Sequence, residues 1–277
     1  MKRLLLSILL GTCCASAQDW ARQKLEKSSR HGEWVTVKHD GRAVETFVVY
    51  PESKAKTPVV LVIHEIFGMT DWVQDLADQV AEAGYIAVAP DLLSGAGPNG
   101  GGTKSLPSGE VGPSIGKLPP DQITADLNAV ADYGLKLPAA NGKLFVAGFC
   151  YGGSQSFRFA TNRPDLKAAF VFYGSAPSSG AQGEFVPDKT ALARIKAPVF
   201  GFFAGNDARI GATIPPTEAA MKELGKTYQP VTYEGAGHGF MREGEDPTSQ
   251  TPMHAANVKA RNEAWTRWKE LLAKYSK

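Results

Sequence analysis

The chain has 277 residues, and 43% of them are hydrophobic, which is enough to fill the core of one large α/β domain. Its 30 Lys and Arg nearly balance its 28 Asp and Glu. This balance indicates neither nucleic acid nor an anionic membrane surface as a partner. After the N-terminal segment, no run of about 18 apolar residues predicts a transmembrane helix.

The N-terminal segment has the pattern of an export signal. Two basic residues, Lys2 and Arg3, precede an apolar stretch from Leu4 to Leu10, and Ala15-Ser16-Ala17 forms a cleavage site. We therefore predict a signal peptide at residues 1–17 and a single domain at residues 18–277. The mature protein would be periplasmic or secreted.

Cleavage at this site would remove two of the three cysteines, Cys13 and Cys14. The mature chain then keeps Cys150 alone and has no intramolecular disulfide, although an oxidising compartment would permit one. A lipid anchor on Cys13 is the weaker alternative, because Thr12 is a poor match for the small residue expected before a lipidated cysteine.

Segments rich in β-branched and apolar residues alternate along the chain with segments of helical period. This alternation predicts an α/β fold with a mostly parallel central sheet of about eight strands and helices on both faces. The predicted strands are Trp34–Lys38, Val44–Val49, Pro58–His64, Tyr85–Ala89, Lys143–Gly148, Ala168–Tyr173, Pro198–Phe203 and Pro230–Glu234. The predicted helices are Asp71–Ala83, Pro120–Leu135, Gly152–Thr161, Ile214–Leu224 and Met253–Lys274.

Residues 93–119 interrupt the alternation with many glycines and prolines. A loop of this length in a compact domain is usually functional or disordered, so we interpret it as a lid or pocket wall. Its run Gly102-Thr103-Lys104-Ser105 lacks the glycine that a phosphate-binding loop has before its lysine. Nucleotide binding is therefore not predicted.

A candidate nucleophile, Cys150, lies in the run Gly148-Phe149-Cys150-Tyr151-Gly152, after an apolar strand and before a glycine-rich helix start. The run matches the G-x-nucleophile-x-G elbow with Cys in place of Ser, and its glycines would let the strand and the helix approach closely. The alternative is a buried structural cysteine, since free Cys behaves as a small hydrophobe. The position between strand and helix favours catalysis.

An elbow nucleophile needs an acid and a base that follow it in the chain in that order. Asp207 comes just after an apolar strand, where a sheet carries its ligand-facing groups, although Asp is also common in turns and caps. His238 lies in a glycine-rich frame before the last helix. In this interpretation His238 accepts the thiol proton, Asp207 orients the imidazole and Cys150 attacks an acyl carbon to form a thioester.

A developing oxyanion needs two backbone N–H donors, one from the residue after the nucleophile and one from the loop after the third strand. These positions predict the amides of Tyr151 and Ile66 as the oxyanion hole.

Together with the cysteine elbow and Asp207, the runs His64-Glu65-Ile66-Phe67-Gly68 and Gly237-His238-Gly239-Phe240-Met241-Arg242 resemble the dienelactone hydrolase (carboxymethylenebutenolidase) family. The resemblance extends from about Trp34 to the last helix. It implies an α/β-hydrolase fold and a Cys-His-Asp triad that opens an unsaturated lactone without a metal or an organic cofactor.

The resemblance also implies roles for Glu65 and Arg242. In the family, the matching glutamate pairs with the arginine, releases it when substrate binds, and helps to deprotonate the thiol, so that the resting cysteine stays unreactive. For an exported protein such masking would protect the thiol from oxidants. From the residues alone, Glu65 could be a solvated acid and Arg242 could serve solubility.

The sequence departs from the family pattern in one respect. The family's enzymes hold the substrate carboxylate with a further arginine after the fourth strand, and residues 93–119 contain no arginine. Lys104 or Lys117 could replace its charge, but a lysine lacks the planar fork that grips a carboxylate.

The sequence thus predicts an exported cysteine-dependent hydrolase of small lactones or esters, and it leaves the oligomeric state open. A general carboxylesterase or thioesterase of the same fold is an alternative. A non-catalytic binding protein on a hydrolase scaffold is another, since fold alone does not determine function. Thiol redox chemistry is disfavoured because the mature chain has no resolving cysteine.

Overall fold

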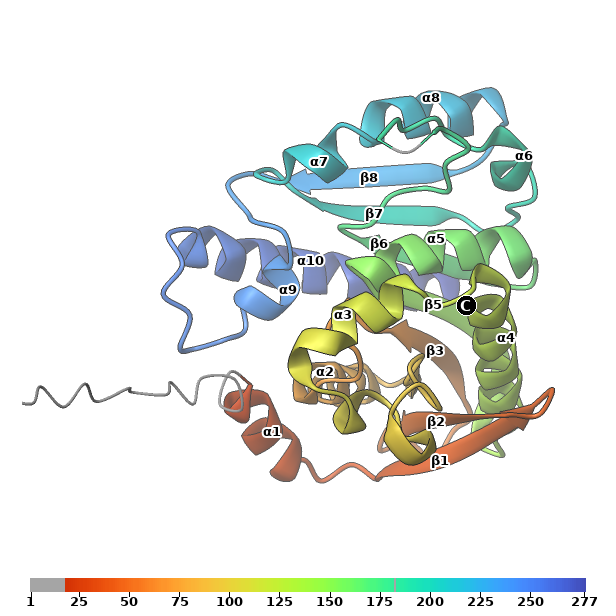
Figure 1. Cartoon of the computed structure of the whole chain (residues 1–277), viewed down its shortest axis with the longest axis vertical. Coiled ribbons are helices and arrows are strands. Elements are labelled where there is room, and N and C mark those ends of the chain that lie inside the picture. Colours follow the sequence, from red (N-terminus) through yellow and green to blue (C-terminus); the bar gives the residue numbers. More distant parts are fainter. Residues whose placement is uncertain (1–17, 182) are drawn as a thin grey trace, which may run out of the picture.

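One eight-stranded sheet organises the part of the chain that the computed structural model describes, residues 18–181 and 183–277. The predicted signal peptide, residues 1–17, lies outside the described residues. Figure 1 shows the sheet twisting from β1 at the bottom of the view to β8 near the top. The strands are β1 (Gly32–His39), β2 (Arg42–Val49), β3 (Thr57–Ile63), β4 (Ile86–Pro90), β5 (Ala140–Phe149), β6 (Ala168–Phe172), β7 (Val199–Ala204) and β8 (Tyr228–Tyr233).

The strand order is β1-β2-β4-β3-β5-β6-β7-β8. Strand β2 pairs antiparallel with β1 and β4, and the pairs from β4 to β8 are parallel. This arrangement confirms the predicted mostly parallel sheet. Because the parallel strands end at the same edge, the segments after β3, β5, β6 and β7 gather there.

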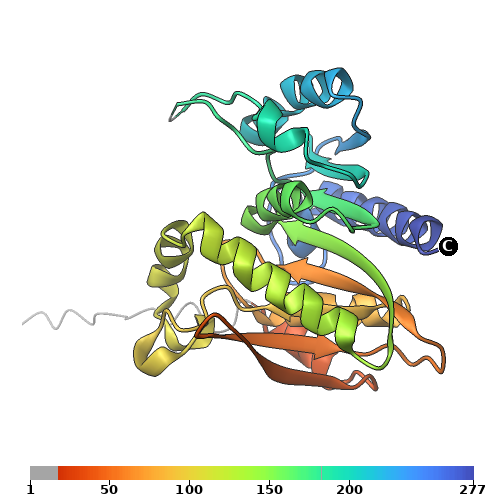
Figure 2. The same ribbon diagram turned by 90° about the vertical axis from the view of Figure 1, so that its right-hand side faces the viewer.

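Two apolar layers cover the sheet, as the uninterrupted burial of β3 requires. One layer contains the apolar faces of α2 and α10, with Trp72 and Trp268 fully buried. The other contains those of α4, α5 and α8, with Leu127, Phe157 and Met221. Figure 2 shows α4 lying across the sheet. None of the described helices is long and apolar enough to span a membrane. These helices are α2 (Asp71–Glu82), α4 (Pro120–Lys136), α5 (Tyr151–Asn162), α8 (Ile214–Glu223) and α10 (His254–Tyr275).

The predicted strands and helices are all present, with ends that differ by a few residues. The sequence analysis missed short helices, because one to two turns leave too few residues for a periodic pattern. They are α1 (Asp19–Glu26), α6 (Lys189–Leu192), α7 (Ala208–Gly211) and α9 (Phe240–Glu243).

The interpretation of residues 93–119 as a loop without regular structure was wrong. This lid segment contains two 3-10 turns, η1 (Pro98–Gly100) and η2 (Thr103–Ser105), and the helix α3 (Ser108–Gly116). Glycines and Pro113 interrupt the helical pattern in the sequence of α3, but Val111 and Ile115 are buried on one face of the helix against Leu93. In Figure 1 the yellow α3 lies in front of the sheet.

A glycine in α5 provides a direct test of how closely the helix approaches the sheet. A Cβ on Gly152 would collide with the carbonyl oxygens of Ile63 and His64, whereas a Cβ on Gly109 in α3 meets nothing within 4 Å. Because the obstacles are backbone atoms, we expect Gly152→Ala to lower the free energy of unfolding by roughly 1–3 kcal/mol or more. Urea unfolding of both alanine variants measures this, and equal stability for the two would contradict the packing.

Candidate active site

Cys150 occupies a strained turn between β5 and α5. Its φ is 55° and its ψ is −114°, a left-handed conformation that non-glycine residues rarely adopt. Its N–H donates to the carbonyl oxygen of Phe172 at 3.1 Å. A Cβ on Gly148 would collide with the carbonyl of Gly152, so the glycines of the elbow allow the chain to double back. This geometry places the thiol at the edge of the sheet where β5 ends.

Three predicted site residues form one chain of contacts. The Nε2 atom of His238 lies 3.1 Å from the Cys150 Sγ, and its Nδ1 contacts the Asp207 Oδ2. A carboxylate partner requires a hydrogen on Nδ1, which leaves Nε2 free to accept the thiol proton.

Asp207 also caps α7, because its Oδ1 accepts a hydrogen bond from the Ile210 N–H at 3.3 Å. The sequence analysis set the cap and the triad as alternatives, but the side chain has two oxygens and makes both contacts. The cap therefore helps to hold the carboxylate in place for His238.

Opposing influences act on the His238 imidazole. Burial lowers its pKa, but hydrogen bonds to Cys150 and Asp207 and the charges of these partners outweigh burial and raise the pKa above its ordinary value. An imidazole with a raised pKa is a stronger base, as a proton acceptor for a thiol needs to be.

The two predicted oxyanion donors lie at the ends of β3 and β5. Tyr151 is the first residue of α5, and Ile66 lies in the turn that follows His64 and Glu65. Within residues 18–181 and 183–277, the amides of Tyr151 and Ile66 have no hydrogen-bond acceptor. They are therefore free to bind a developing negative charge.

Glu65 is buried, with 2% of its surface exposed, and the possibility of a solvated acid was wrong. Its Oε2 accepts a hydrogen bond from the Arg242 Nε at 2.8 Å, and Tyr173 donates to its Oε1 at 3.4 Å. Burial raises the pKa of the Glu65 carboxyl, while Arg242 and Tyr173 oppose this shift. Arg242 also pairs with Glu243 at 2.6 Å, so it does not serve solubility alone.

The sequence analysis missed other residues of this site. Tyr173 is fully buried at a φ of 39°, and its ring packs edge-on against His238 with centroids 5.1 Å apart. The Phe67 ring lies 5.2 Å from the Arg242 guanidinium carbon, and the Asn257 Oδ1 accepts from Gly237 N–H at 2.8 Å. The position of Tyr173 directly after a buried strand was the available signal.

A cavity of about 650 Å³ lies between the turn after β3 and the lid segment. Phe67, Met69, Leu106 and Val111 supply apolar walls, and Lys104 supplies a cation. Lys117, the C-cap of α3, does not line it. Cys150, Asp207 and His238 do not line it either, and the cavity approaches the predicted site through Phe67, which follows Ile66 in the chain.

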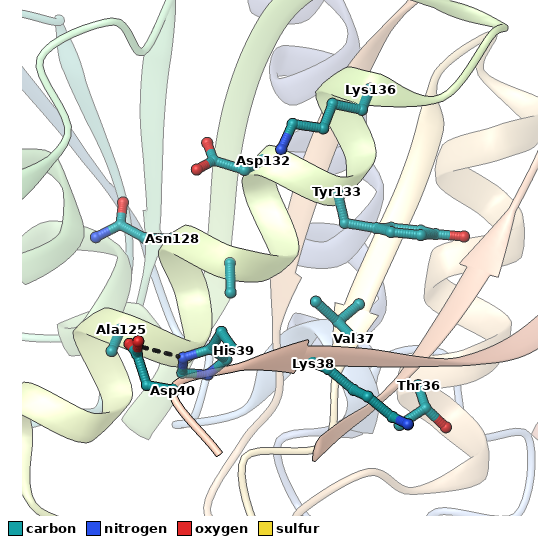
Figure 3. Close-up of a pocket in the computed structure, with 11 residues that line it drawn as sticks. Thr36, Val37, Lys38, His39, Asp40, Ala125, Asn128, Asp132, Tyr133 and Lys136 are labelled. Carbon is teal, nitrogen blue, oxygen red and sulfur yellow. Dashed lines mark hydrogen bonds and ion pairs between the residues drawn. The ribbon is translucent and has the colours of Figure 1, made fainter. Parts of the chain in front are cut away.

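A second hollow, of about 500 Å³, lies between β1 and α4 (Figure 3). His39, Asp132 and Lys136 line it, and none of the predicted site residues does. Among the residues that the structure describes, no cluster of three or more His, Cys, Asp or Glu side chains could hold a metal ion.

Comparisons with known proteins place the chain in a family. The family model described as "Dienelactone hydrolase family" matches residues 44–276. Two relatives carry the name "Putative carboxymethylenebutenolidase". The one from Salmonella typhi is 30% identical over 226 residues, which make up 80% of this chain and 79% of the relative. The one from Methylorubrum extorquens is 31% identical over 215 residues, 76% and 72% of the two chains.

The fold has a solved counterpart. A crystal structure from Klebsiella pneumoniae, named "Putative Dienelactone Hydrolase", superposes with a TM-score of 0.74 and 24% identity, over 90% of this chain and all of its own. The mostly parallel sheet and the turn at Cys150 define an α/β-hydrolase. Within that class the chain belongs to the dienelactone hydrolase family, which makes it a hydrolase acting on ester bonds.

The contact between Asp207 and His238 predicts a pH effect. Because Asp207 raises the pKa of His238, we expect Asp207→Asn to lower the apparent pKa of kcat/KM for ester hydrolysis. The rate should also fall by roughly 10²-fold or more, since a general base contributes about that much. The pH–rate profile measures both effects.

Asp188 offers a matched control, because its carboxylate caps α6 through the Ala191 N–H at 3.0 Å and makes no contact with the triad. Asp188→Asn should leave the profile unchanged. An unmoved or raised apparent pKa in Asp207→Asn would contradict the role of His238 as base.

Proposed function

We propose that this protein is an exported cysteine hydrolase that opens small lactones or esters through a thioester acyl-enzyme. The observation that carries the proposal is the continuous contact from the Cys150 Sγ through His238 to Asp207 at a strained elbow. A non-catalytic protein on this scaffold would have no need for the strain or the alignment.

Acylation begins when the His238 Nε2 takes the proton of the Cys150 thiol. The sulfur then attacks the carbonyl carbon, and the carbonyl oxygen takes up the negative charge between the N–H groups of Ile66 and Tyr151. When the intermediate collapses, the carbon–oxygen bond of the ester breaks and the imidazolium returns its proton to the leaving oxygen. In a lactone the new hydroxyl stays attached to the acyl group.

Deacylation uses the same groups. A water molecule gives a proton to His238 and attacks the thioester carbon, the oxyanion forms between the same two amides, and the thiolate leaves. The carboxylic acid is released and the Cys150 thiol is restored by the proton on His238.

The pairing of Glu65 with Arg242 supports a role in activating the thiol. The carboxyl is buried and its pKa is already raised, with Arg242 as the main opposing influence. An anionic substrate that draws Arg242 away would raise the pKa of Glu65 further, so the carboxylate would accept a proton. We assign the response to substrate to Arg242, and to Glu65 a role that assists His238 in drawing the proton from the Cys150 thiol.

Export is supported by the pattern of residues 1–17. A thiol that ionises fully only with substrate bound would resist oxidation in that compartment.

Lys104 is the better candidate for binding the substrate carboxylate. It lines the cavity beside Phe67, and its Nζ lies 5.7 Å from the centre of the exposed Trp34 ring, whereas Lys117 is outside the cavity. Without an arginine in residues 93–119, however, a general carboxylesterase or thioesterase remains the second candidate.

The first experiment is hydrolysis of cis- and trans-dienelactone and of p-nitrophenyl acetate by the mature protein and by Cys150→Ala. We expect turnover of a dienelactone and its loss in the variant, to below about 10⁻³ of the normal rate, because the variant lacks the sulfur that attacks the carbonyl carbon in the proposed mechanism. Turnover of the generic ester alone would support the second candidate. Undiminished hydrolysis by Cys150→Ala would rule out the mechanism.

The lysine assignment has its own test with a matched pair of variants. Lys104→Gln should raise KM for an ester that carries a carboxylate by roughly 5- to 10-fold, about 1 kcal/mol for one partly exposed ion pair, and leave KM for a neutral ester unchanged. Lys117→Gln should change neither. Equal effects of the two substitutions would remove Lys104 from the binding site.

A further inference from the structure

A buried histidine beside the proposed oxyanion hole has no part in the reaction as described above. His64 directly follows β3, precedes Glu65, and has 0% of its surface exposed. Burying a polar ring without solvent is costly unless both nitrogens have partners.

Both nitrogens do have partners. The Nε2 lies 3.2 Å from the N–H of Leu92, and the Nδ1 lies 2.7 Å from the carbonyl oxygen of Glu65. Because the Leu92 amide can only donate, Nε2 must accept, and the hydrogen of the neutral ring is on Nδ1. Burial lowers the pKa of His64, although the charge of Asp91 opposes this, so the ring stays neutral. His64 therefore donates to Glu65.

The accepting carbonyl belongs to the same peptide unit as the Ile66 N–H. The described chain has no cis peptide bond, and in a planar trans unit the C=O and the N–H point in opposite directions. A donor that fixes the Glu65 oxygen thereby fixes the direction of the Ile66 N–H. The N–H of Gly68 also donates to this oxygen, at 3.1 Å, and closes the turn.

The far side of the ring is anchored as well. Leu92 follows Asp91, whose carboxylate accepts hydrogen bonds from the Thr103 N–H and hydroxyl, each at 2.7 Å. The Thr103 Oγ1 in turn accepts from the Met69 N–H at 3.1 Å. The turn after β3 is thus held at its start by His64 and at its end by the lid segment.

We propose that His64 is a positioning residue that orients the Ile66 N–H toward the oxyanion by holding the Glu65 carbonyl. The inference rests on the proposed function, because an oxyanion forms only if Cys150 attacks a carbonyl. His64 itself touches neither the substrate nor the reacting atoms.

Two substitutions separate the two ring nitrogens. In His64→Asn the side-chain amide nitrogen takes the place of Nδ1 and keeps the donor to Glu65. In His64→Gln the amide reaches the place of Nε2, where its oxygen accepts from Leu92, and the donor to Glu65 is lost. We expect Asn to keep the acylation rate within a few-fold and Gln to lose roughly 10²-fold, as loss of an oxyanion donor does.

The measurement is the burst of p-nitrophenol from p-nitrophenyl acetate, beside the rate at which iodoacetamide alkylates Cys150. Alkylation displaces iodide at a saturated carbon and forms no oxyanion, so it reports only the access and ionisation of the thiol. We expect it to be unchanged in both variants, whereas general damage to the site would slow alkylation and acylation together.

The outcomes are distinct. If the Asn and Gln variants both melt at the wild-type temperature and acylate at equal rates, the role of His64 is overturned. A rate of alkylation that falls together with the rate of acylation would also overturn it. If the Gln variant does not fold, a hundred-fold loss in a stably folded Asn variant overturns it instead. A wild-type protein with no burst that depends on Cys150 would overturn the proposed function and this inference together.

Discussion

The close approach of α5 to the sheet is the constraint on which the site depends. With glycine at positions 148, 152 and 153, backbone meets backbone between β5, β3 and the segment after β6. Where the chain reverses, Cys150 takes a positive φ, which costs about 1–3 kcal/mol for such a residue. The packing around the elbow supplies this energy, and the strain directs the thiol to the sheet edge.

Parallel pairing brings the other groups to the same place. Glu65, Tyr173 and Asp207 follow β3, β6 and β7 in the sequence, and these strands end together with β5. Glu65 is an expensive residue at a buried position, and the guanidinium of Arg242 offsets the cost. Because the pair is buried, water screens its charges little, and a change at either partner alters the electrostatic environment of His238.

Much of this could be predicted from the sequence, since order along the chain carries the information. Continuous apolar runs marked the strands, and Cys150, Glu65 and Asp207 lie within a few residues of the ends of these runs. Helix α3 in the lid segment was not predictable. Its glycines and Pro113 lower the helix propensity, and the burial of Val111 and Ile115, which depends on the tertiary structure, offsets this loss. The contacts of Tyr173 with Glu65 and His238 were not predictable either. They depend on the positive φ of Tyr173, which the residue types around it do not indicate.

The hydrogen bonds of Asp91 and Thr103 connect the cavity wall to the turn after β3. Thr103 lines the cavity, binds the carboxylate at the end of β4, and accepts from the amide of Met69. A Cβ on Gly68 would collide with the Thr103 side chain, so glycine at this position allows the turn and the lid segment to pack closely. Buried bonds of this kind are costly to break one at a time. A change in the lid segment at Thr103 would therefore also disturb the turn that carries the Ile66 N–H, the proposed oxyanion donor.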